Sequence, residues 1–209
     1  NLLSKEGKTV LVVTKNKEVV GLLAIKDPIK PTSISAVKAL KEKGIKVVML
    51  TGDNIDTANT IASEVGIDNV IAGVLPTTKQ AVIKEEMSKC DGLVAMVGDG
   101  VNDALALTTA DLGIAIGGGS DVALESSYIV LLRSDLLDVL NVINLSKKVL
   151  NTIKGNLFWA FFYNCIGVLL ASGIFYYAFG IKLNPMIGSL AMSFSSVFVV
   201  VNALRINLF

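Results

Sequence analysis

The sequence contains no histidine and only two cysteines among its 209 residues. Without an imidazole group, acid–base catalysis or metal binding has to use carboxylates, lysines, hydroxyls or sulfur. Cys90 and Cys165 lie far apart in the chain and neither belongs to a Cys-x-x-Cys pair, so the sequence suggests neither a disulfide framework nor a zinc site. This cysteine usage fits a reduced, cytoplasmic setting.

Charge is almost missing from the last quarter of the chain. Lys182 and Arg205 are the only charged residues between positions 156 and 209, whereas residues 1–155 carry the other 17 basic and all 18 acidic side chains. The first region is close to neutral and has no basic run, so it lacks the electrostatic signature of nucleic-acid binding. The hydrophobic residues, 52% of the chain, are concentrated in the second region.

Two uncharged stretches in the second region are long enough to cross a bilayer. As helices, residues 156–181 and 183–204 would span about 39 and 33 Å, against roughly 30 Å of hydrocarbon. A buried hydrophobic hairpin in a soluble core is the alternative, and it is disfavoured because soluble cores rarely need two such runs in succession. Lysines precede the first stretch and Arg205 follows the second, so the positive-inside rule predicts a cell-membrane hairpin with both ends cytoplasmic.

The first region has the pattern of an α/β fold. Residues 9–14 and 19–25 predict a β-hairpin around a polar turn. Beyond it, helices are expected at about 32–43, 56–65, 78–89, after Asn102 and at 120–126, and strands at 45–50, 69–73, 92–98, 112–116 and 128–132. Short apolar strands between amphipathic helices predict a mostly parallel sheet with helices on both faces. Ligands bind such sheets at the carboxyl ends of the strands.

Polar loops follow two of these strands at that position. Asp99 at the end of one strand suits a hard cation such as Mg²⁺, while Asn102 is expected to cap the next helix and Asp103 to lie in its first turn. Thr51–Asp53 offers a hydroxyl and backbone amides to phosphate oxygens, and Lys79 adds a positive charge at the start of its helix. Each feature alone is common in structural turns, so the prediction rests on their joint order.

The segments MLTGDNIDTANTIASEVGI, LPTTK and AMVGDGVNDALAL together resemble the phosphorylation domain of P-type ATPases, in the haloacid dehalogenase-like superfamily. The resemblance extends upstream through DPIKP at 27–31, which is similar to the family's hinge, and covers nearly the whole chain. It implies a Rossmannoid parallel sheet followed by a two-helix transmembrane hairpin. The implied parts are the last hairpin of a nucleotide-binding domain at 1–26, the phosphorylation domain at 27–134, a connecting helix at 135–155, and transmembrane helices at 156–181 and 183–206.

The resemblance also implies a site that uses ATP and Mg²⁺. Asp99 would bind the catalytic Mg²⁺ with Asp103 supporting it. The phosphoryl group would be held by Thr51, Gly52, Asn102 and Lys79, and Asp53 would lie near the nucleotide. These roles suit phosphoryl transfer, which depends on positioning and charge neutralisation. The family's nucleophilic aspartate lies in a DKTGT motif that is absent from this sequence, so we expect the chain to be part of a longer transporter.

In the second region, FWAFFYN and NPMIGSLAMSFSSVFVVVNALR resemble the last two helices of the copper(I) branch of heavy-metal P-type ATPases. The resemblance implies that Tyr163, Asn164, Met192 and Ser196 bind the transported metal. For any one of these residues alone, simple helix packing is the better explanation. Together, a thioether and neutral oxygens without a carboxylate suit a soft monovalent cation.

The expected function is therefore an ATP-driven copper(I) exporter, with silver(I) as a second substrate. The alternative is a catalytically dead membrane protein that binds metal or a partner ATPase. A membrane-tethered phosphatase is disfavoured because phosphatases of this superfamily also need the absent nucleophile.

Overall fold

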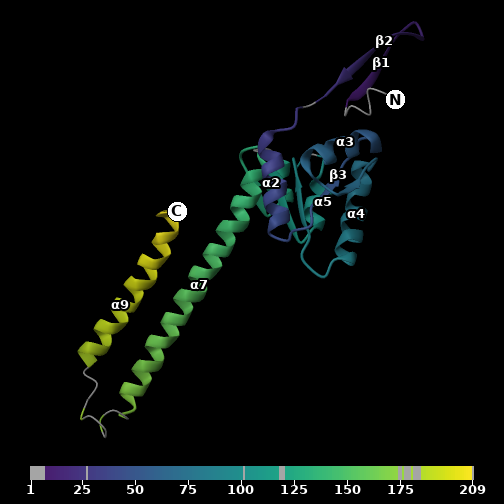
Figure 1. Ribbon diagram of the computed structural model, residues 1–209. Coiled ribbons are helices and arrows are strands. Elements are labelled where there is room, and N and C mark those ends of the chain that lie inside the picture. Colours follow the sequence, from purple (N-terminus) through teal and green to yellow (C-terminus); the bar gives the residue numbers. More distant parts are fainter. Residues whose placement is uncertain are drawn as a thin grey trace. The chain divides into compact units, whose positions relative to one another are not determined.

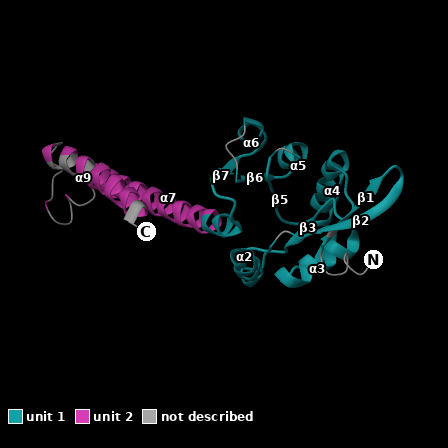
Figure 2. Ribbon diagram, turned by 90° about the horizontal axis from the view of Figure 1, so that it is seen from above, with its two compact units in different colours: residues 1–141 teal, residues 142–209 magenta. Residues whose placement is uncertain are grey.

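The computed structural model describes residues 8–26, 28–100, 102–117, 121–173, 176, 180 and 185–208. It divides into two compact units, Asn1–Asn141 and Val142–Phe209 (Figure 2). The elements of the first unit (Figure 1) are, in chain order, β1 (Thr9–Lys15), β2 (Glu18–Ile25), α2 (Pro31–Glu42), β3 (Val48–Leu50), α3 (Ile55–Val65), β4 (Asn69–Ile71), α4 (Pro76–Lys89), β5 (Ala95–Gly98), α5 (Ala104–Thr109), β6 (Leu112–Ile116), α6 (Asp121–Ser126) and β7 (Ile129–Leu131).

The predicted N-terminal hairpin is confirmed, because β1 and β2 pair antiparallel along their length. Its turn contains Asn16 and Lys17, which both have positive φ, at 51° and 71°. Two successive left-handed residues give a turn whose twist matches that of the strands, and asparagine tolerates this conformation better than most residues.

The helices and strands that follow alternate as predicted, and every pairing among β3 to β7 is parallel. The strands do not form one continuous sheet. In the described part of the chain, β3 pairs with β4 alone and β5, β6 and β7 form a second sheet. Leu50 of β3 nevertheless packs against the core cluster of Ile83, Met96, Ala106, Leu107 and Ala110, so apolar contact joins the two pieces where a ladder does not.

Close packing of α5 on β6 depends on a residue without a side chain. A Cβ at Gly113 would lie 2.5 Å from the carbonyl oxygen of Leu107, whose side chain is fully buried in the same core. The helix backbone therefore approaches the strand more closely than any other residue would permit.

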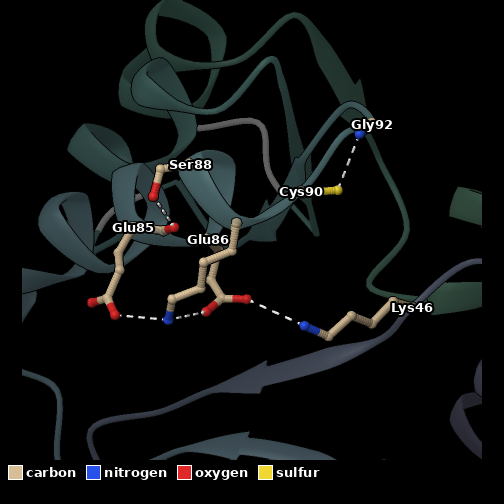
Figure 3. A network of polar contacts seen from close by, with 7 residues as sticks. Lys46, Glu85, Glu86, Ser88, Cys90 and Gly92 are labelled. Atoms are coloured by element: carbon tan, nitrogen blue, oxygen red, sulfur yellow. Dashed lines mark hydrogen bonds and ion pairs between the residues drawn. The ribbon is translucent and has the colours of Figure 1, made fainter.

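A network of ion pairs lies at the C-terminal end of α4 (Figure 3). The Lys89 ammonium contacts Glu85 at 2.7 Å and Glu86 at 3.2 Å, and Lys46, just before β3, contacts Glu86 at 3.4 Å. The hydrogen bond from Lys89 is the largest cause that holds the pKa of the Glu86 carboxyl below its ordinary value, with Lys46 adding to it. The network thus connects the end of α4 to the entry of β3.

The two ends of the first unit are also connected. The Lys30 ammonium, at the start of α2, donates a hydrogen bond to the carbonyl oxygen of Ser134, which precedes α7. Lys30 belongs to the predicted hinge segment at 27–31, of which Asp27 lies outside the described residues.

The second unit consists of helical elements, α7 (Leu136–Ala171), α9 (Pro185–Leu204) and the short η1 (Arg205–Leu208), with α7 beginning in the first unit. No break separates the expected connecting helix at 135–155 from the apolar span, because α7 is one continuous helix across that boundary. It ends at Ala171, earlier than the expected 181, and Gly173 follows with φ 79°. A glycine in this left-handed conformation is a common helix terminator.

Within the described residues, α7 is the one helix that is long and apolar enough to cross a membrane, with a mean hydropathy of 1.3. A shorter apolar helical stretch covers Ser193–Leu204 in α9. Parts of both expected spans lie outside the described residues, namely 174–175, 177–179 and 181 in the first span and 183–184 in the second.

Gly113→Ala is expected to lower the free energy of unfolding by about 1–3 kcal/mol, because the added methyl overlaps a backbone oxygen in a packed core. Urea denaturation followed by far-ultraviolet circular dichroism measures the change. Gly21→Ala is the matched control, since a Cβ at Gly21 meets nothing within 4 Å. Equal stability of the two variants would show that α5 does not pack on β6 as described.

Candidate functional site

The loop after β3 is closed by its own side chains. The Thr51 hydroxyl donates a hydrogen bond to the Asp53 carboxylate at 3.0 Å and accepts one from the Asp53 backbone N–H at 3.1 Å. Asn54 then caps α3, because its side-chain oxygen accepts a hydrogen bond from the Thr57 N–H at 2.9 Å. Thr51 and Asp53 therefore lie together in a turn that leads directly into a helix.

A second segment supports this loop from the side. After β4, the Gly73 N–H donates to the Asp53 carbonyl at 2.8 Å and the Val74 N–H donates to the Thr51 carbonyl at 3.1 Å. A Cβ at Gly52 would lie 3.3 Å from the carbonyl oxygen of Val74, so the two segments are in close contact. This support was not predicted from the sequence. Its one local sign is Gly73, which adopts a left-handed conformation with φ 68°.

The loop after β5 holds the expected magnesium ligands. Asp99 is exposed, and its Oδ1 accepts a long 3.4 Å hydrogen bond from the Asn102 backbone N–H. The expectation that Asn102 caps the next helix is wrong. Asp103 occupies the N-cap position of α5, with φ −110° and ψ 3°, and makes no side-chain capping bond.

Asp103 does not cap α5 because its carboxylate is engaged by a lysine from another helix. The Lys79 ammonium in the second turn of α4 lies 2.6 Å from Asp103 Oδ1, and the two side chains are only 14% and 13% exposed. A Cβ at Gly98 would lie 2.5 Å from Asp103 Oδ2, so this glycine leaves the space that the carboxylate fills. The short distance and low exposure make this a strong charge-assisted hydrogen bond.

This ion pair links the two loops. Val74, bonded to Thr51, immediately precedes the N-cap residue of α4, and Lys79 lies on that helix. One continuous path therefore runs from the Thr51–Asp53 turn through the start of α4 to Asp103. It relates the loop after β3 to the loop after β5 although no ladder joins their strands.

The donor set is compatible with Mg²⁺ but does not form a closed cage. Among the described residues there is no cluster of three or more histidine, cysteine or acidic side chains that could hold a metal. Asp99 and Asp103 supply two carboxylates in one loop. Mg²⁺ is typically bound by one or two carboxylates together with waters and substrate phosphates, which matches so open a set.

The residues expected to bind the transported metal lie on two helices. Tyr163 and Asn164 are in α7, and Met192 and Ser196 are in α9, where the side chain of Met192 lies outside the described residues. The Tyr163 ring lies 6.1 Å from that of Trp159, which in turn contacts Phe198 of α9 at 6.0 Å. These ring contacts are typical of helix packing.

Comparison with protein families supports the α/β fold of the first unit. A family model described as haloacid dehalogenase-like hydrolase matches residues 1–111.

Relatives with assigned roles align with nearly the whole chain. A silver exporting P-type ATPase from Salmonella typhimurium is 50% identical over 98% of this chain and 25% of its own length. A copper-exporting P-type ATPase from Bacillus subtilis gives the same values. The chain therefore spans about a quarter of the length of these relatives.

The fold also matches solved structures. A crystal structure of a zinc-transporting PIB-type ATPase in the E2.Pi state has a TM-score of 0.78 and 33% identity, covering 99% of this chain and 32% of that one. The catalytic domain of the CPx-ATPase CopB-B has a TM-score of 0.50 and 29% identity over 61% of this chain.

Lys79→Met is expected to lower the free energy of unfolding by about 1–3 kcal/mol, because the Asp103 carboxylate is left at low exposure without its cation. Asp103→Asn should lower the free energy of unfolding by a similar amount, because the Lys79 ammonium is then left at low exposure without its anion. The double variant should be clearly less destabilised than the sum of the two, as measured by chemical denaturation in a double-mutant cycle. Lys46→Met, which removes an exposed lysine from a longer contact, is the control; additive effects of the two site substitutions would contradict a direct ion pair.

Proposed function

Because this chain belongs to the haloacid dehalogenase-like hydrolase family and aligns along 98% of its length with metal-exporting P-type ATPases, we propose that it is part of an ATP-driven copper(I) exporter. In this proposal the first unit performs part of the phosphoryl-transfer chemistry that drives transport. The second unit contributes two membrane-spanning helices to the ion path. The remaining length of the transporter supplies the nucleophilic aspartate, for which this sequence has no DKTGT motif.

The ion pair between Lys79 and Asp103 is the observation that carries the catalytic part of the proposal. It keeps a cation and a carboxylate at the loop where a phosphoryl group and its Mg²⁺ would meet. Asp99 and Asp103 would hold the Mg²⁺, which when bound neutralises phosphate charge. When a phosphoryl group enters, the Lys79 ammonium can contact its oxygens without leaving Asp103, since an ammonium has three donors.

The Thr51 loop completes the arrangement. The Thr51 hydroxyl and the backbone at Gly52 would bind phosphoryl oxygens, Asn102 would contribute from the other loop, and Asp53 would lie toward the nucleotide. The exposed position of Gly52 and Asn102 leaves them accessible to a ligand. Positioned donors of this kind provide most of the catalysis in phosphoryl transfer.

The second unit supports a place in the cell membrane. In this proposal both α7 and α9 cross the bilayer, and the soluble unit and the C-terminus are cytoplasmic. Lys147, Lys148 and Lys154 near the start of the apolar part of α7, and Arg205 after α9, are the basic residues expected on the cytoplasmic side. The lipid bilayer and the rest of the transporter are then the partners of these helices.

Copper(I) is favoured over zinc by ligand chemistry and by similarity. The thioether of Met192 and the neutral oxygens of Tyr163, Asn164 and Ser196 suit a soft monovalent ion, and neither helix offers a carboxylate within its apolar part. A silver exporting and a copper-exporting P-type ATPase, each 50% identical over 98% of this chain, support this choice. Silver(I), with the same charge and softness, is expected to be a second substrate.

The full-length protein is expected to bind copper(I) more tightly than zinc(II), and Met192→Ala should weaken copper(I) binding by at least about tenfold because a soft ligand is lost. Isothermal titration with each metal measures both affinities. Met186→Ala is the matched control, since Met186 lies in the same helix and is 82% exposed. Equal zinc(II) binding that is insensitive to Met192→Ala would refute copper(I) as the substrate.

The continuous helix α7 is expected to couple the two units mechanically. Lys148→Pro should uncouple ATP turnover from transport, because proline removes a helical hydrogen bond and costs about 3 kcal/mol in a helix interior. The measurements are metal-stimulated ATP hydrolysis and copper(I) uptake into inverted vesicles. Lys148→Ala removes the same charge but keeps the helix, and it should leave coupling intact.

Normal coupling in the Lys148→Pro variant would contradict mechanical coupling of the two units through α7. The same assay separates the alternative function. A catalytically dead protein that binds metal or a partner ATPase would bind copper(I) without any metal-stimulated ATP hydrolysis in the unmodified protein.

A further inference from the structure

An amide pair connects α7 to α9 inside the second unit. The side-chain N–H of Asn202 donates to the side-chain oxygen of Asn156 at 2.7 Å, and the contact is partly buried. We propose that Asn156 and Asn202 are positioning residues that fix the axial register of the two helices and thereby bring the metal-binding residues to one level. This inference rests on the proposed function for the identity of the metal-binding residues, but the register itself does not.

A second contact defines the direction of the helices. The Trp159 ring of α7 lies 6.0 Å from the Phe198 ring of α9 in an edge arrangement. The residue number rises from Asn156 to Trp159 while it falls from Asn202 to Phe198, so the helices run antiparallel. Both contacts occur on successive turns and agree on the same register.

This register places the expected metal-binding residues at the same depth. Asn164 lies eight residues beyond Asn156, and the position eight residues before Asn202 is 194. Position 194 lies midway between Met192 and Ser196. The expected metal-binding residues of α7 and α9, which are at least 28 positions apart in the chain, therefore lie at a similar height along the two helices.

The register also determines which side of the pair these residues occupy. With about 100° of rotation per residue, Asn164 lies roughly 80° round α7 from Asn156, and Ser196 lies roughly 120° round α9 from Asn202. Because the helices are antiparallel and both right-handed, these rotations turn toward the same side of the pair. Met192 precedes Ser196 by four residues and so belongs to the same face of α9.

The amide pair can fix this register because apolar contacts alone specify it weakly. Sliding one helix by a turn, about 5.4 Å, exchanges one apolar contact for another of similar strength. The same slide would separate the two amides and leave each unpaired in an apolar setting, which costs free energy. A single buried asparagine pair sets the register of coiled coils for the same reason.

The register is tested first, independently of transport. In a Cys90→Ser, Cys165→Ser background of the full-length protein, the pair Ala160→Cys and Val199→Cys is oxidised with diamide. Ala160 and Val199 lie one turn from the amide pair, both half-buried. We expect rapid disulfide formation, and slower formation in the offset control pair Ala160→Cys and Ser195→Cys. An offset pair that forms at the same rate or faster would overturn the proposed register.

The positioning role is tested by metal affinity. Asn156→Leu, Asn202→Leu and the double variant should each weaken copper(I) binding by about threefold to thirtyfold, the range expected for one interhelical hydrogen bond in a membrane. The double variant should be no weaker than either single one, because all three remove the same bond. Asn156→Asp keeps an acceptor for the Asn202 amide and should restore most of the affinity. The affinity for ATP, measured in parallel, should not change.

Unchanged copper(I) affinity in the leucine variants, additive losses, or an equal loss of ATP affinity would each overturn the positioning role. Failure of the proposed function has a different signature. In that case the disulfide still forms at the expected pair, while the unmodified protein binds no copper(I) at all.

Discussion

The candidate catalytic site depends on one ion pair at low exposure, between Lys79 of α4 and Asp103 at the start of α5. It determines the geometry around it: Asp103 is held away from its capping role, Gly98 leaves the space for its carboxylate, and the start of α4 is drawn to the loop after β5. Since α4 is also bonded to the Thr51 loop through Val74, the same interaction relates two loops that share no strand ladder. A charged pair is suited to this task because separation of the partners at low exposure is costly.

The second unit contains a comparable directional contact. Asn156 and Asn202 form a polar contact between two apolar helices, where the surrounding side chains discriminate poorly between alternative registers. In the arrangement that we propose, a single directional contact in each unit selects one packing from several that apolar contacts would permit. The continuous helix α7 carries the chain from one unit into the other, and the proposed coupling of phosphoryl transfer to metal movement depends on its continuity.

Much of the fold was predictable because it is encoded locally. The polar turn at Asn16 and Lys17, the alternation of apolar strands with amphipathic helices and the apolar character of α7 are all properties of adjacent residues. The errors have a common origin. Asn102 is a good helix cap by residue type, yet the cap position belongs to Asp103, whose side chain is taken by a lysine 24 residues earlier. The division of the strands into two sheets likewise depends on pairing between distant segments.

By itself the sequence determined the candidates for the proposed chemistry: carboxylates and glycines at the ends of strands, a lysine at the start of a helix, and neutral oxygen and sulfur side chains in an apolar region. Residue type and spacing suffice for this, because they decide local conformation and ligand preference. Only the tertiary structure decided which of them meet. The Lys79–Asp103 contact, the support of Thr51 by Val74 and the Asn156–Asn202 register each join residues that are 23 to 46 positions apart. Such contacts depend on how the chain packs in three dimensions, which no local pattern specifies.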